Sequence, residues 1–154
     1  MLEILGVIGT DATARDLRRQ IEAAPESERG EVYIDSRGGS LAEADRMLEL
    51  LRPHRPTALI DTAHSAAAYL AVQLPRRMVY PFGELLIHSA WRCDGRTGDS
   101  DAEEIAKRNR MMAAAFVAHS RLTLAEVETL IRGESYVKAD EAVRWGLADG
   151  VVRF

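Results

Sequence analysis

Several features that would direct the function of a chain are scarce in this sequence. It holds a single cysteine, Cys93, among 154 residues, so an internal disulfide is excluded and a reducing compartment is compatible. No apolar run approaches the roughly 20 residues of a membrane-spanning helix. The net charge of −4 provides no general electrostatic attraction to nucleic acid. These absences predict a cytoplasmic protein that binds neither a membrane nor nucleic acid.

The common signatures of cofactor and metal sites are also missing from the sequence. It has no Walker A loop and no GxGxxG fingerprint, and its four histidines show neither HExxH nor His-x-His spacing. The two lysines, Lys107 and Lys138, are both expected on exposed helices, which makes a Ser–Lys catalytic dyad hard to build. We therefore predict that the protein uses no metal and no cofactor.

What is present is typical of one globular domain spanning residues 1–154. Hydrophobic residues make up 47% of the chain and charged residues 29%, which is enough to bury a core without disulfides. Strand-like and helix-like segments alternate, and this pattern predicts an α/β fold with largely parallel strands. We expect strands at 2–8, 31–35, 57–61, 77–80, 84–87 and 147–152, and helices at 12–24, 41–51, 66–74, 101–120, from Thr123 onward and at 138–145.

A glycine pair lies at the first strand-to-helix turn that carries chemistry, in the segment SRGGS from Ser36 to Ser40. Because Gly38 and Gly39 have no Cβ, their backbone N–H groups can approach a ligand closely. Such a turn can hold an oxyanion or a phosphate. It can equally be a tight turn without any ligand, and the glycine pair alone does not decide between the two.

A serine flanked by alanines lies at the next strand-to-helix transition, in the segment DTAHSAAA that starts at Asp61. Ser65 has the placement of an exposed nucleophile, and the N–H of Ala66 lies at the start of the helix, although the G-x-S-x-G pattern is absent. The alternative is that Ser65 only caps the helix, a common role for serine. His64 is adjacent in sequence, and neighbouring side chains usually point apart.

A histidine, His88, ends the apolar strand LLI, 23 residues after Ser65. The chain has room over that distance to return beside the serine, although a histidine at such a place is often only structural. A general base needs a third group that holds its tautomer and stabilises its cation. Candidate carboxylates at later strand or turn positions are Asp94, Asp99, Glu134 and Asp140.

These segments occur in an order that resembles the family of Clp protease proteolytic subunits, including the small members related to phage head-maturation proteases. The matching segments are SRGGS, DTAHS, LLIHSA and, most closely, GESYVKADEAVRWGLADGVV. They cover nearly the whole chain. The resemblance implies a crotonase-like spiral of ββα units and a serine peptidase that cleaves peptide or protein substrates.

The resemblance also assigns roles to individual residues. Ser65 takes the position of the nucleophile, His88 that of the general base, and Glu134 that of the acid. The oxyanion hole is implied at the N–H of Gly39 or Gly38 and at that of Ala66. The sequence departs from the family pattern at four positions. Arg37 replaces a proline, Asp61 replaces a glycine, His64 replaces an alanine, and Glu134 replaces an aspartate.

Further expectations concern assembly and the alternatives to catalysis. The apolar stripe of Met111, Met112, Phe116 and Val117 lies on the helix by which the family's rings stack, which predicts a homo-oligomer. The first core strand begins at Leu2, without the N-terminal segment with which family members engage an AAA+ ATPase, and this predicts an ATPase-independent peptidase. The alternatives are a catalytically inactive scaffold of the same fold and, less favoured, a crotonase-type acyl-CoA enzyme.

Overall fold

Parallel strands form the centre of this computed structural model, which describes residues 1–90 and 99–153, with backbone only for 99–101. The strands run in the order β1-β2-β3-β4-β5, and β6 pairs with β4. Neighbours are parallel throughout, except that β5 runs antiparallel to β4. The predicted α/β class is confirmed. The strands are β1 Leu2–Leu5, β2 Glu31–Ser36, β3 Thr57–His64, β4 Arg76–Ile87, β5 Ser135–Lys138 and β6 Gly150–Val151.

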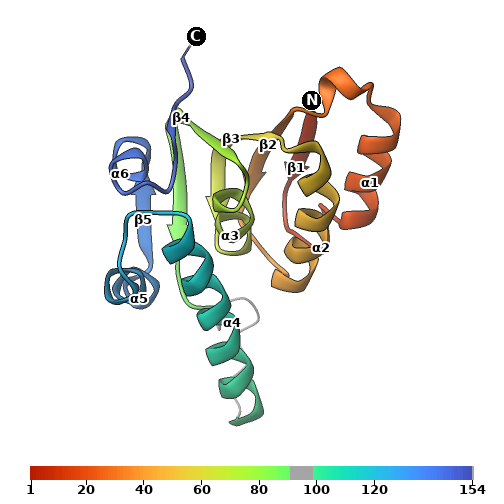
Figure 1. Ribbon diagram of the computed structural model, residues 1–154. Helices are drawn as coiled ribbons and strands as arrows, with labels where there is room; N and C mark the ends of the chain where they lie inside the picture. Colours follow the sequence, from red (N-terminus) through yellow and green to blue (C-terminus); the bar gives the residue numbers. More distant parts are fainter. Residues whose placement is uncertain (91–98, 154) are drawn as a thin grey trace.

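Helices α1, α2, α3 and α4 follow one another across the sheet, and α5 and α6 lie beside β5 (Figure 1). Side-chain caps fix where several of them begin. Thr13 caps α1, Ser40 caps α2, and Thr123 forms a capping box with Glu126 at α5. No helix in the described part of the chain is long and apolar enough to cross a membrane. The helices are α1 Ala14–Ala23, α2 Leu41–Leu51, α3 Ala66–Val72, α4 Asp99–Ala118, α5 Leu124–Gly133 and α6 Ala139–Arg144.

Alternation along the strands separates a core face of the sheet from an outer face. Ala63, Leu85 and Val137 are register partners on β3, β4 and β5, and all three are fully buried. Residues one position away on each strand, such as His64 and Tyr136, point to the other face. Helix α3 is buried along its whole length, which explains why its segment is alanine-rich.

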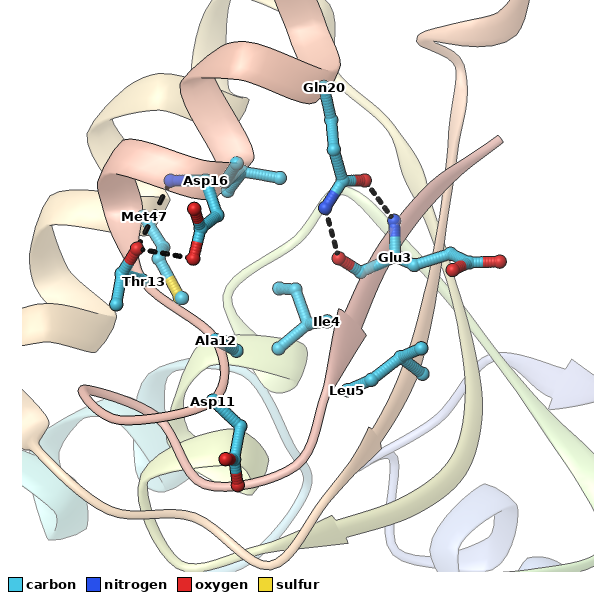
Figure 2. Close-up of a pocket in the computed structure, with 10 residues that line it drawn as sticks. Glu3, Ile4, Leu5, Asp11, Ala12, Thr13, Asp16, Gln20 and Met47 are labelled. Atoms are coloured by element: carbon cyan, nitrogen blue, oxygen red, sulfur yellow. Dashed lines mark hydrogen bonds between the residues drawn. The ribbon is translucent and has the colours of Figure 1, made fainter.

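The edge strand β1 is protected by a side chain that takes the place of a neighbouring strand. The Gln20 amide accepts a hydrogen bond from the Glu3 N–H at 2.8 Å and donates one to the Glu3 carbonyl at 2.9 Å, as Figure 2 shows. Unpaired strand edges invite association with other chains. The shallow pocket beside this pair, which Asp11, Thr13 and Met47 also line, is thus part of the structural closure of the sheet edge.

Two sequence-based predictions of strands are corrected by the structure. β4 is a single strand of 12 residues instead of two, although its pairing with β3 shifts at residues 80–83, where the two strands had been separated. Gly83 is required there because a Cβ would lie 2.7 Å from the Ile60 carbonyl oxygen. Strand β5 was not predicted at all, and Lys138 ends this strand instead of lying on a helix.

Arg77 on β4 fastens the segment that precedes β6. Its guanidinium donates to both carboxylate oxygens of Asp149, and its backbone N–H donates to the same carboxylate. The Arg77 hydrogen bonds hold the pKa of Asp149 below its ordinary value, against the opposing effect of burial. The folded state is therefore stabilised by this pair above the ordinary carboxyl pKa, and the stabilisation is lost as the pH falls through the lowered pKa.

We expect Asp149→Asn to lower the free energy of unfolding by about 1 kcal/mol at neutral pH, since the carboxylate is partly exposed and water weakens the pair. The difference from the native chain begins to shrink below about pH 4, where the unfolded chain takes up a proton at Asp149, and it disappears below the lowered pKa of the folded chain, where both side chains are neutral. Urea unfolding at a series of pH values measures this difference. Glu49→Gln, at an exposed carboxylate on α2, is the matched control. A difference that persists unchanged into acid would contradict the assignment.

Candidate active site

Ser65 occupies a sharp turn between β3 and α3, in a backbone conformation that residues with a side chain rarely adopt. Its φ and ψ are 56° and −117°, and the residue is 4% exposed. The turn is held by two backbone hydrogen bonds, from the Ser65 N–H to the Leu86 carbonyl at 2.8 Å and from the Tyr69 N–H to the Ser65 carbonyl at 3.0 Å. Such backbone strain persists only where the surroundings determine it, and it occurs often at functional sites.

The alternative that Ser65 only caps α3 is wrong. Ser65 stands at the capping position, but its hydroxyl makes no capping hydrogen bond to the helix. The caps of α1 and α2, Thr13 and Ser40, both accept such a bond, so the difference lies in the local geometry of Ser65 and not in its residue type. The serine oxygen is therefore not used for the common structural purpose.

The glycine pair packs directly against this turn. Gly38 has a φ of +93°, and a Cβ placed on it would lie 2.5 Å from the His64 carbonyl oxygen and 3.0 Å from the Ser65 Cβ. Gly39 has a φ of +140°, and its Cβ would overlap the Ile8 carbonyl. Both glycines are thus required by close approach as well as by backbone conformation. The two segments singled out from the sequence, SRGGS and DTAHS, meet in space.

The backbone N–H groups of the glycine pair differ in their use. The Gly38 N–H donates to the Ser36 Oγ at 3.1 Å. The isolated bridge between Ile8 and Gly39 uses the Gly38 carbonyl and the Ser40 N–H. Among the described residues, the N–H of Gly39 itself has no acceptor. Of the two amides expected at an oxyanion hole, that of Gly39 is therefore the better candidate.

His88 directly follows β4 and is half-buried. Its Nδ1 lies 2.7 Å from the carbonyl oxygen of Ser89. A carbonyl only accepts hydrogen bonds, so in the neutral ring Nδ1 carries the proton and Nε2 is the nitrogen with the lone pair. Within the described residues no hydrogen bond joins the Ser65 hydroxyl to His88 or the His88 ring to Glu134. The serine is nevertheless fastened to β4 at Leu86, two residues before the histidine.

Glu134 lies at the end of α5, with a φ of 52°, and directly precedes β5. The antiparallel register ends with the pair Ile87 and Ser135, so His88, which follows Ile87, and Glu134, which precedes Ser135, both lie just beyond the same end of this pairing. Strand β5 is what gives Glu134 this place, and sequence reasoning missed the strand. The β-forming pair Tyr136 and Val137 was the available signal.

Of the other candidate carboxylates, the described side chains include only Asp140, which does not share this placement. Asp140 is exposed in the first turn of α6. Asp94 lies outside the described residues, and so does the side chain of Asp99. In the described part of the chain, no group of three or more His, Cys, Asp or Glu side chains is arranged to hold a metal ion.

Asp61 and His64, two departures from the family pattern, are both engaged away from the serine. The Tyr33 hydroxyl donates to the Asp61 carboxylate at 2.7 Å, and this hydrogen bond, with burial, raises the pKa of Tyr33 to about 12. The His64 Nε2 lies 2.9 Å from the Glu84 carboxylate. Neither side chain therefore crowds the Ser65 turn.

Comparison with known proteins places the chain in a family. The Clp protease family model matches residues 7–154. The chain is 32% identical to ATP-dependent Clp protease proteolytic subunit 2 of Leifsonia xyli subsp. xyli, with 96% of this chain and 72% of that protein covered. It is 29% identical to subunit 4 of Streptomyces avermitilis, with 96% and 71% covered. The resemblance inferred from the four motifs is confirmed, and the chain belongs to the Clp protease family.

Proposed function

We propose that the protein is a serine endopeptidase in which Ser65 is the nucleophile, His88 the general base and Glu134 the acid. The observation that carries the proposal is the conformation of Ser65. A buried serine is held at φ 56° and ψ −117° between a strand and a helix, with a hydroxyl that makes no capping bond. A strained strand-to-helix turn of this kind presents a nucleophilic oxygen next to the backbone N–H of the following residue.

The chemistry proceeds in two halves. The Ser65 Oγ attacks the carbonyl carbon of a peptide bond while His88 Nε2 takes the hydroxyl proton, and a tetrahedral oxyanion forms. The N–H groups of Gly39 and Ala66 stabilise this oxyanion, with a contribution of about 3 kcal/mol for a well-placed donor. His88 then gives the proton to the leaving amine, and the C–N bond breaks to leave an acyl-serine. A water molecule, deprotonated by His88, releases the acid product and restores Ser65.

Glu134 stabilises the imidazolium that His88 becomes in each half of the reaction. The Ser89 carbonyl, which accepts from Nδ1, fixes the required tautomer of the neutral ring. In this arrangement the Ser89 carbonyl fixes the tautomer of the neutral His88 ring, and Glu134 stabilises the positive charge of the protonated ring. The role of Glu134 is supported by its position directly before β5, at the end of the β4–β5 pairing that His88 follows.

A catalytically inactive scaffold is the second candidate. The observation that favours it is that the described residues include no hydrogen bond between Ser65 and His88. In active serine hydrolases without a bound substrate this contact is often long, and it tightens when a substrate binds. Its length in the free chain therefore does not decide between the two candidates, and reactivity does.

The purified chain, without ATP, should react with a fluorophosphonate that carries a fluorescent tag. We expect a single adduct, which peptide mass spectrometry locates on Ser65, and no adduct after the chain is unfolded in urea, because the activation of the hydroxyl depends on the fold. Free serine hydroxyls do not react with this probe. A folded chain that stays unlabelled, or that is labelled at another serine, would sink the peptidase proposal and favour the inactive scaffold.

Assembly and energy coupling stay predictions for this chain. The relatives are named proteolytic subunits of an ATP-dependent protease, which supports a homo-oligomer. The same names attach ATP dependence to those proteins. The prediction of an ATPase-independent peptidase is separate from the proposal of catalysis, because the fluorophosphonate reaction needs no ATP.

A further inference from the structure

Three adjacent strands carry the three residues of the proposed triad. Ser65 follows β3, His88 follows β4, and Glu134 precedes β5. A small shift of one strand against the others would change the distances from its residue to the other two. The relative position of β3, β4 and β5 at this end of the sheet is therefore a condition for catalysis.

A cluster of side chains on the outer face joins these three strands. The His64 Nε2 on β3 lies 2.9 Å from one carboxylate oxygen of Glu84 on β4. The other oxygen of Glu84 accepts a hydrogen bond from Lys138 on β5 at 2.8 Å. Tyr136, also on β5, contacts the His64 ring edge to face, with 5.8 Å between the centroids and 84° between the planes. We call these four residues the His64 cluster.

The shielded part of the His64 cluster is the contact between His64 and Glu84, whereas Tyr136 and Lys138 are exposed. The His64 side chain is 14% exposed and that of Glu84 is 22% exposed, so their contact is partly removed from water. Lys138 and, to a lesser extent, His64 lower the pKa of Glu84 and so favour the carboxylate form that binds both partners. A pair in such a position resists movement more than a solvent-exposed ion pair does.

His64 also touches both parts of the proposed site through its backbone. It is the residue before Ser65, whose N–H is bonded to Leu86 on β4. Its carbonyl oxygen is the atom closest to the site of a Cβ on Gly38. A displacement of His64 therefore moves the serine and the glycine loop together. The strained conformation of Ser65 needs surroundings that hold it in place, and the His64 cluster provides one such restraint.

We propose that His64 is a positioning residue for the hydrolysis, which acts by fastening the end of β3 to β4 and β5 so that Ser65 stays in register with His88 and Glu134. This inference rests on the proposed function. It explains why a histidine, whose side chain does not serve Ser65 as a partner, stands directly before the nucleophile.

Kinetics of inactivation by a tagged fluorophosphonate test the proposal, since they separate the maximal rate of reaction from the affinity for the probe. His64→Ala should lower the maximal rate about tenfold, because a displacement well below 1 Å is enough for that effect, and should leave the affinity unchanged. His64→Gln should restore most of the rate, because the glutamine amide nitrogen can take the place of Nε2 against Glu84. Thermal unfolding of each variant shows that it is folded.

Tyr33→Phe is the matched control, since it removes one cross-strand hydrogen bond between β2 and β3 and keeps the aromatic ring that packs against Tyr80 on β4. Its maximal rate should equal that of the native chain. If His64→Ala reacts as fast as the native chain, or if Tyr33→Phe slows the reaction equally, the positioning role is wrong while the proposed function stands. If the native chain itself does not react, the proposed function fails and the positioning role fails with it.

Discussion

Ser65→Ala and Ser65→Gly should both lose hydrolysis by a factor of about 10⁶, which means no measurable turnover and no fluorophosphonate adduct. Their stabilities, however, should differ in a direction set by the backbone. Alanine keeps a Cβ at φ 56° and ψ −117°, whereas glycine adopts such a conformation without strain. We expect the free energy of unfolding of Ser65→Gly to exceed that of Ser65→Ala by about 1 kcal/mol. This difference already includes the larger conformational entropy that glycine loses on folding.

The measurements are a peptidase or esterase assay and urea unfolding of the three chains under the same conditions. Ala67→Gly, in the first turn of α3, is the control for the general effect of glycine, and it should lower the stability by at least about 1 kcal/mol, because it also removes a buried methyl group. Opposite signs at 65 and 67 would show that the native serine is held under strain. Residual hydrolysis in Ser65→Ala above that of an unrelated protein would remove Ser65 from the role of nucleophile. A Ser65→Gly chain less stable than Ser65→Ala would contradict the strain.

Local patterns in the sequence were sufficient to predict most of the helices and strands that flank the candidate active site. The helix at 41–51 was predicted with the boundaries that the structure has, because its apolar residues are spaced as on one face of a helix, and the structure adds that Ser40 caps it. The approach of Gly38 to Ser65 was not readable in the same way, because it depends on the pairing of β2 with β3. What the sequence supplied there was the residue type that such an approach requires.

The features that could not be predicted are those that depend on contacts between residues far apart in the sequence. Strand β5 is four residues long and pairs antiparallel at the end of an otherwise parallel sheet, so its short pattern was outweighed by the helix signals on either side. For the same reason the partners of His64 were not predictable, since Glu84 is 20 residues away and Tyr136 lies on the missed strand. Only the direction of the His64 side chain away from Ser65 was predictable, since neighbouring side chains on a strand point to opposite faces.

Gly38→Ala should damage both the fold and the reaction, because the new methyl group meets backbone atoms that have little freedom to move. Its Cβ would lie 2.5 Å from the His64 carbonyl oxygen and 3.2 Å from the Ala66 nitrogen, at a φ of +93° that disfavours any side chain. Strain and overpacking together should lower the free energy of unfolding by about 3 kcal/mol. Relief of the clash would push the glycine loop away from Ser65 and would carry the Gly39 N–H with it.

Gly30→Ala is the control that separates this effect from the loss of a glycine as such. No atom lies within 4 Å of a Cβ at Gly30, and its φ is outside the left-handed region, so its stability should stay within about 0.5 kcal/mol of the native chain. In the fraction of Gly38→Ala that remains folded, hydrolysis should fall at least about 100-fold, the effect of losing one oxyanion donor. A folded Gly38→Ala chain that reacts at the native rate would show that the glycine loop supports the Ser65 turn without taking part in the reaction, and the oxyanion donors would then have to be sought elsewhere.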